Sequence, residues 1–207
     1  KQAEEALKRS EEQVRLLLNS TGEAIYGIDM QGDCTFANPS CLKMLGYASV
    51  DQLLGKNMHD LIHHSYPDGS PMRVQNCRIY RAFHEGKPNH VDDEVLWKAD
   101  GTSFPAEYWS YPQIINGEIC GAVVTFVDIT ERKQIEASLQ QRESYLRAII
   151  ENQPGLVWLK NTQSQFLAVN QAFALSCGKQ RPDDLVGKTD LDIWPQELAE
   201  QYRRDDI

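Results

Sequence analysis

Apolar residues recur every three to four positions in two separate segments, residues 1–17 and residues 131–149. This spacing predicts an amphipathic helix in each segment. The apolar positions are Leu7, Val14 and Leu17 in the first segment and Ile135, Leu139, Leu146 and Ile149 in the second. Asp128 is followed three residues later by Glu131, the spacing of a capping box, which predicts where the second helix starts. We therefore place a domain boundary near residue 130.

The chain between these helices shows short alternating segments separated by turn residues, a pattern typical of strands and short helices. The predicted strands are residues 24–29, 34–37, 91–98, 103–114 and 118–127, and the predicted helices are residues 41–45, 50–54 and 74–84. Asp100-Gly101 and Asn116-Gly117 supply hairpin turns, and Gly46 and Gly55 each end a helix. The predicted order is two strands, three helices and three strands.

The chain also contains an internal repeat, which appears when the sequence is shifted by 132 positions against itself. The identical pairs are Asn38 and Asn170, Gly46 and Gly178, Asp51 and Asp183, Leu53 and Leu185, Gly55 and Gly187, and Lys56 and Lys188. We expect each asparagine to bond backbone groups at a strand-to-helix turn. In this alignment Ile207 corresponds to Gln75, so the second copy is expected to lack its long helix and last three strands.

Composition and charge exclude several classes of function. The net charge is -9, without a basic cluster, so nucleic acid is not an expected partner. No apolar stretch approaches the roughly 18 residues of a membrane span, and the polar N-terminus is not a signal peptide. Five cysteines without a CxxC spacing favour a reducing, cytoplasmic location.

Four sequence segments together resemble a PAS domain with its trailing C-terminal motif: IYGIDMQGDCTFANPSCLKMLGY, LLGKN, WKADGTSFPAEYW and GAVVTFVDITERK. The resemblance covers residues 16–133 completely and the second copy in part. It implies an α+β fold, a five-stranded antiparallel sheet with helices on one face, in tandem and joined by amphipathic helices. The implied domains are a signalling helix (1–17), a complete sensory PAS (18–130), a linker helix (131–149) and the N-terminal half of a second PAS (150–207).

The resemblance implies a cytoplasmic sensory module of a larger bacterial-type signalling protein, with no catalytic activity of its own. A histidine kinase is the expected parent, and the expected partners are a second copy, through the amphipathic helices, and a downstream transmitter domain. The tandem arrangement resembles the redox sensors that regulate nitrogen fixation and methane monooxygenase. This implies FAD in the first PAS as a detector of redox state or oxygen.

The candidate flavin-binding residues combine aromatic surface with a few polar groups, as a polar heterocycle requires. They are Asn57, His63, Tyr80, Phe83, Glu94, Leu96, Trp97, Tyr108 and Phe126. Flavin-binding relatives carry an amide side chain where this chain has Leu96, which is a departure from the pattern. Leu96 and Trp97 must point to opposite faces of their strand. A ligand-free dimerisation and relay module is the alternative, with aromatic residues that fill a core.

Light-driven flavin chemistry is excluded by position. Asn76-Cys77-Arg78 resembles the reactive tripeptide of light-sensing PAS domains, but in those domains it directly follows the turn that is Gly55-Lys56-Asn57 here. Met58 occupies the nucleophile's place, and its thioether has no proton to lose. Cys77 is therefore expected to be a small buried side chain.

Heme and catalysis are weaker alternatives. The adjacent His63 and His64 offer imidazoles, the usual axial ligands of heme PAS sensors, but the ligand position of the oxygen-sensing branch is near Gln75. No HExxH, paired-cysteine or GxSxG spacing occurs, so neither metal-binding nor catalytic residues are predicted. The acidic run of Asp92, Asp93 and Glu94 is expected to be a solvated strand face with one inward carboxylate. By resemblance, residues 128–130 pass strain from the last strand to the linker helix.

Overall fold

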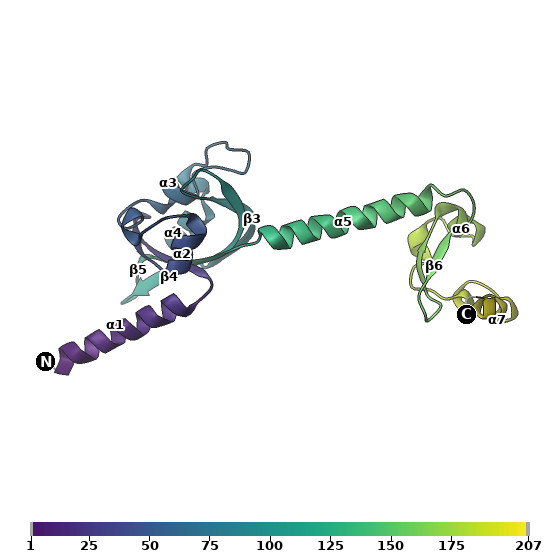
Figure 1. Ribbon diagram of the computed structural model, residues 1–207, viewed down its shortest axis with the longest axis horizontal. Helices are drawn as coiled ribbons and strands as arrows, with labels where there is room; N and C mark the ends of the chain where they lie inside the picture. Colours follow the sequence, from purple (N-terminus) through teal and green to yellow (C-terminus); the bar gives the residue numbers. More distant parts are fainter. Residues whose placement is uncertain (1, 206–207) are drawn as a thin grey trace. The chain divides into compact units, whose positions relative to one another are not determined.

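The computed structural model describes residues 2–205, which divide into two compact units on either side of Lys133 (Figure 1). The first unit contains a long N-terminal helix and a five-stranded antiparallel sheet in the order β2-β1-β5-β4-β3. Its elements are α1 (Gln2–Ser20), β1 (Ala24–Asp29), β2 (Cys34–Ala37), α2 (Pro39–Leu45), α3 (Met58–Ile62), α4 (Arg78–Glu85), β3 (Asn89–Trp97), β4 (Ser103–Ile115) and β5 (Glu118–Asp128). The sheet and element order confirm the predicted α+β class.

The core of the first unit lies between the sheet and helices α2, α3 and α4. Tyr26 of β1, Tyr108 of β4 and Phe126 of β5 are almost completely buried, and the rings of Tyr26 and Phe126 meet edge to face at 6.0 Å. Phe83 supplies the largest buried side chain of α4. Because large aromatic side chains bury the most apolar surface, these residues dominate the packing energy of the unit.

Two predicted helices differ from those observed. The segment 50–54 forms only a 3₁₀ turn, η1 (Val50–Gln52), and the helix predicted over 74–84 is divided at Cys77. The 3₁₀ turn η2 (Val74–Asn76) precedes Cys77, whose extended backbone and Sγ atom, an acceptor for Tyr80 N, cap the start of α4. The apolar spacing continues through both parts, so periodicity alone predicts one helix.

Asn38 and Asn170 fulfil the structural role predicted for them. Asn38 is buried, and its Oδ1 accepts hydrogen bonds from Ile25 N and Cys41 N, both at 2.9 Å. Its amide nitrogen donates to the carbonyls of Leu18 and Glu23. Asn170 Oδ1 likewise accepts from two backbone N–H groups, those of Val157 and Phe173. The same side chain therefore joins a strand to a helix in both copies.

The second unit contains the end of a long helix, a strand hairpin and short helices. Its elements are α5 (Thr130–Glu151), which begins in the first unit, β6 (Trp158–Lys160), β7 (Phe166–Val169), α6 (Gln171–Ser176), η3 (Pro182–Asp184), η4 (Asp190–Asp192) and α7 (Gln196–Asp205). Phe166, Phe173 and Leu185 form its small core. Helix α7 corresponds to residues 64–73 of the first copy, a loop that contains Pro67, Gly69 and Pro71, whereas α7 contains neither residue type.

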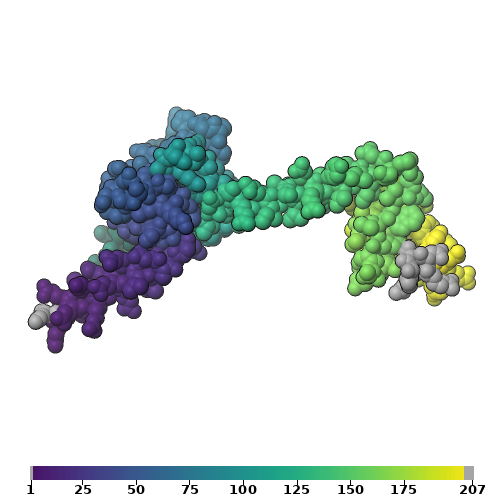
Figure 2. Space-filling view, viewed as in Figure 1, coloured from purple at the N-terminus to yellow at the C-terminus, as the bar shows by residue number. Residues whose placement is uncertain are grey.

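The apolar positions that predicted amphipathic helices are exposed. Leu7, Val14 and Leu17 of α1 are each more than half exposed, and Figure 2 shows most of α1 projecting from the body of the first unit. Ile135 and Leu139 of α5 are also more than half exposed. Among residues 2–205, no helix combines the length and the apolar character that a membrane crossing requires.

Candidate functional site

A small cavity lies beneath β1, at the point where helices α3 and α4 meet the sheet. Its volume is about 20 Å³. Pockets that enclose drug-sized ligands have volumes of roughly 300–1,000 Å³, whereas a single water molecule needs about 10–15 Å³. The lining residues are Tyr26, Ile28, Gly32, Asn57, Met58, His59, His63, Val74, Cys77, Ile79, Tyr80 and Phe83.

Seven of the nine candidate residues fall into two groups, and the other two lie apart. The four from the helical side all line the cavity, and three from the strands belong to the buried core next to it. The cavity residues are Asn57, His63, Tyr80 and Phe83, and the core residues are Leu96, Tyr108 and Phe126. Glu94 is half-buried and contacts His63. Trp97 lies outside the core: its indole N–H donates to Ser65 O at 3.0 Å and its ring stacks on His64.

A bulge in β3 directs Glu94 toward the core. Val91 pairs with Tyr108, but Glu94 pairs with Ala106, so β3 contains one additional residue between these pairs. A shift of one residue reverses which side chains face inward. Val91 and Glu94 therefore both point to the core side, while Asp92 and Asp93 are exposed. This confirms the expected solvated strand face with one inward carboxylate.

Three side chains converge on the Glu94 carboxylate. Tyr108 OH donates to Oε2 at 2.5 Å, Arg78 Nε lies 3.1 Å from Oε1, and His63 Nε2 lies 2.9 Å from Oε2. His63 Nε2 has no hydrogen-bond partner among residues 2–205, so this last approach is an ion-pair contact. Burial raises the pKa of Glu94, but its contacts with His63 and Tyr108 outweigh burial and hold the pKa below its usual range.

His63 also contacts Cys77 on its other face. His63 Nδ1 lies 3.1 Å from Cys77 Sγ, and both side chains are buried. Burial alone would raise the pKa of Cys77, but polar contacts with His59 and His63 lower it to about 6. Burial lowers the pKa of His63, whereas contacts with Cys77 and Glu94 raise it, to about 9. The pair therefore favours a thiolate beside an imidazolium.

The expected FAD does not fit this core. Tyr26, Phe83, Leu96 and Phe126 fill the space between the helices and the sheet, and each is at most 1% exposed. The remaining 20 Å³ is far smaller than an isoalloxazine ring. A porphyrin is larger still, so the same packing opposes heme.

A family model described as the PAS fold matches residues 12–129, more than half of the chain. The chain belongs to the PAS family. A second model, also of the PAS fold, matches residues 150–206, so the chain is a tandem PAS protein.

Curated relatives are multidomain signalling proteins. The chain is 31% identical over 146 residues to the probable diguanylate cyclase DgcE of Escherichia coli (strain K12), covering 70% of this chain and 13% of that protein. It is 24% identical over 165 residues to Sporulation kinase A of Bacillus subtilis (strain 168), covering 80% of this chain and 26% of that protein. The chain thus spans about a quarter or less of these relatives.

A solved structure of an RNA-binding light-oxygen-voltage receptor is similar in fold. Its TM-score is 0.51 at 21% sequence identity, over 65% of this chain and 37% of that chain. At this identity the likeness extends to the PAS fold alone.

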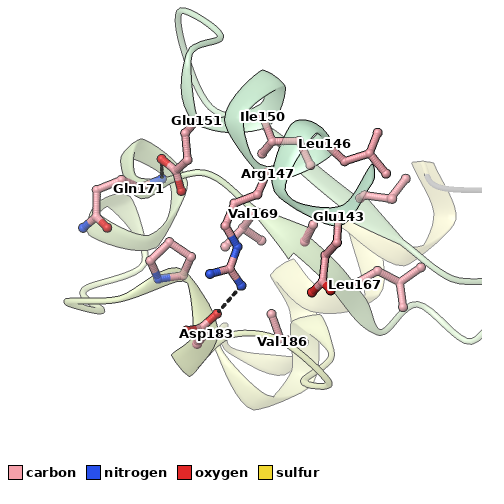
Figure 3. A pocket seen from close by; sticks show the side chains of 13 residues that line it. Glu143, Leu146, Arg147, Ile150, Glu151, Leu167, Val169, Gln171, Asp183 and Val186 are labelled. Carbon is pink, nitrogen blue, oxygen red and sulfur yellow. Dashed lines mark hydrogen bonds and ion pairs between the residues drawn. The ribbon is translucent and has the colours of Figure 1, made fainter. Parts of the chain in front are cut away.

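The second PAS unit has a groove of a different kind, with a volume of about 620 Å³. Figure 3 shows Leu146 and Ile150 of α5 and Leu167 of β7 along it, with Arg147 directed toward Asp183 at 3.4 Å. Because much of the lining is aliphatic, this groove is better suited to packing against an apolar surface than to binding a polar ligand.

Sequence reasoning identified His63 but missed His59 and the role of Cys77. Cys77 is buried, as expected, but it is also a polar partner of His63. The four-residue spacing of His59 and His63 was the available signal, because residues four apart share one face of a helix. Nothing in the sequence indicated that Cys77 packs against the side of α3 that carries these histidines.

Proposed function

We propose that this tandem PAS chain is the sensory and relay region of a larger signalling protein. In this proposal the first PAS unit responds to a chemical change in its core and passes the response to α5. The observation that carries the proposal is the junction between β5 and α5, where the first turn of the output helix is attached directly to the sheet.

The junction contains contacts of three types. Ile129 is buried, and its N–H donates to Pro105 O of β4 at 3.0 Å. Asp128 Oδ1 accepts from Thr130 N, the first residue of α5, at 2.8 Å. Arg132 lies 2.7 Å from Glu107 of β4.

Arg132 also approaches Asp92 of β3 at 3.8 Å. Glu107 and Asp92 point outward from strands whose neighbouring residues, Tyr108 and Val91, are buried. A change in how β3 and β4 pack on the helices would therefore move the groups that hold the first turn of α5. This gives a short physical route from core to output helix.

Dimerisation and the nature of the output are further parts of the proposal. The exposed apolar positions of α1 and α5 supply surfaces that a second copy can cover, and helices of two to three heptads need such partners to be stable. The relatives that the chain resembles are a kinase and a probable diguanylate cyclase. We favour a histidine kinase as the parent, as expected from the sequence.

FAD-dependent redox sensing was the expected stimulus, with ligand-free relay and heme as alternatives. The packed core favours a PAS domain that acts without a large cofactor. A flavin response would require Phe83, Leu96 and Phe126 to leave their buried positions, at a cost of roughly 2 kcal/mol for each side chain exposed.

The relay is tested by Arg132→Ala in the full-length parent protein. Loss of the pairs with Glu107 and Asp92 releases the first turn of α5, so we expect the basal kinase or cyclase output to change at least about threefold, as about 0.7 kcal/mol of lost coupling would produce. Gln141→Ala, at an exposed position of the same helix, is the control and should leave output unchanged. Equal output from the native protein and Arg132→Ala would contradict the relay.

A further inference from the structure

We propose that His59, His63 and Cys77 form a binding site for one Zn²⁺ ion in the first PAS unit. One ligand atom from each side chain lies within 4.8 Å of the other two. His59 lies in the first turn of α3, His63 four residues later is its C-cap, and Cys77 is the N-cap of α4. The site therefore joins two helices that are adjacent in space but separated by a long loop. This inference goes beyond the proposed relay to α5.

The orientation of the two imidazoles supports metal binding. His59 Nε2 lies 3.0 Å from the carbonyl oxygen of Met72, and His63 Nε2 lies 2.9 Å from Glu94 Oε2. Metal-binding histidines generally direct their second nitrogen at a carbonyl or carboxylate, which orients the ring and fixes its tautomer. His59 has such a hydrogen-bond partner, whereas Nε2 of His63 faces the Glu94 carboxylate as an ion-pair contact without a hydrogen bond, so Nδ1 is the nitrogen of each ring that remains for a metal ion.

The Nδ1 atoms of the two histidines differ in their partners. His63 Nδ1 is 3.1 Å from Cys77 Sγ, whereas His59 Nδ1 is buried and has no hydrogen-bond partner within residues 2–205. Buried polar atoms are rarely left without a partner in native structures. A cation at the centre of the three side chains would use both nitrogens and the sulfur at once.

The donor set selects the class of metal. Two imidazole nitrogens and a thiolate suit Zn²⁺, whereas Mg²⁺ and Ca²⁺ require oxygen ligands. With Zn–N of about 2.0–2.1 Å and Zn–S of about 2.3 Å, tetrahedral ligands are about 3.5 Å apart. The Nδ1–Sγ distance of 3.1 Å needs only a small side-chain rotation to reach this value. The proton that His63 and Cys77 share would leave to solvent as the metal binds.

Three protein ligands leave one position on the ion, as in zinc sites that exchange ligands. The adjoining cavity of about 20 Å³ has the volume of one water molecule. Glu94 contacts His63 and belongs to β3, so binding of a metal ion would also change a contact of the sheet. A metal ion, or a small ligand bound to that ion, is therefore a stimulus small enough for this core.

The test is a titration of the metal-free 207-residue chain, without a histidine tag, with Co²⁺ as the spectroscopic probe. We expect one equivalent to produce visible bands of a tetrahedral site and a thiolate-to-metal charge-transfer band, both abolished when Zn²⁺ is added. Cys77→Ser should remove the charge-transfer band, and His59→Gln should weaken binding more than about 100-fold. The matched controls, Cys120→Ser and His84→Gln, lie outside the cluster and should bind as the native chain does.

Absence of a charge-transfer band, or a band that Cys77→Ser leaves intact, would overturn the proposal. Circular dichroism checks that each variant folds; if Cys77→Ser does not, His59→Gln decides, because His59 is only partly buried. Zn²⁺ should also raise the Tm of the native chain and both controls but not that of His59→Gln. These readouts do not involve signal output, so failure of the metal site and failure of the relay to α5 are distinguishable.

Discussion

At the scale of single residues, the chain depends on buried polar side chains that bond several backbone groups at once. Asn38 joins the end of α1, β1 and the start of α2 through four carbonyl and N–H partners. The cluster around Glu94 likewise joins β3, β4 and α4. Such residues determine the arrangement of elements more than their small volume suggests.

We expect Asn38→Ala to lower the free energy of unfolding of the first unit by roughly 2–4 kcal/mol, because it leaves the N–H groups of Ile25 and Cys41 buried without acceptors. Urea denaturation followed by tryptophan fluorescence measures the change. Asn76→Ala, at an exposed position, is the control and should cost less than about 0.5 kcal/mol. Equal stability of the two variants would show that Asn38 does not hold the turn.

The sequence predicted this asparagine because it recurs in both copies, 132 residues apart. It did not predict the partners of Cys77, since the contact with His63 joins residues from different helices. Such a contact depends on how α3 and α4 pack, which no local pattern encodes. Trp97 shows the same limit: alternation along β3 separated it from Leu96 but did not say which of the two faces the core.

At the scale of elements, strands and turns were predictable because they carry strong local signals. The Asn-Gly and Asp-Gly turns fixed the long hairpins, and the predicted strand bounds differ from the observed ones by at most two residues. The division of residues 74–84 at Cys77 was not predicted, because a cap made by a thiol has no usual sequence signature. The β3 bulge was not predicted either, because the acidic pair Asp92 and Asp93 indicates a solvent-exposed strand face but not an additional residue in the strand.

The small volume of the cavity in the first unit's core is also an element-scale result with a direct test. Because the helices and sheet enclose only about 20 Å³, we expect the purified native chain to show neither a structured blue flavin band nor an intense Soret band. An absorption spectrum of the chain, isolated from cells supplied with riboflavin and heme, checks this. Stoichiometric flavin in that preparation would mean that the core opens, and would restore the FAD hypothesis.

At the scale of the whole molecule, the chain consists of two PAS units joined in sequence through α5. The internal repeat alone predicts this organisation, because both copies share the same asparagine and glycine positions. The stimulus was less predictable, since PAS domains share a fold and differ in their cores. The core of the first unit contains a compact group of histidine, cysteine and carboxylate side chains.

The most direct test of the relay is to change the rotational register of α5 in the full-length parent protein. One residue inserted after Lys133 rotates the rest of the helix by about 100°, whereas seven residues nearly restore its phase. A one-residue insertion after Pro67, in an exposed loop, controls for general damage. We predict that signal output is lost or inverted with one residue and recovered with seven, and output unchanged by the single insertion after Lys133 would contradict the account.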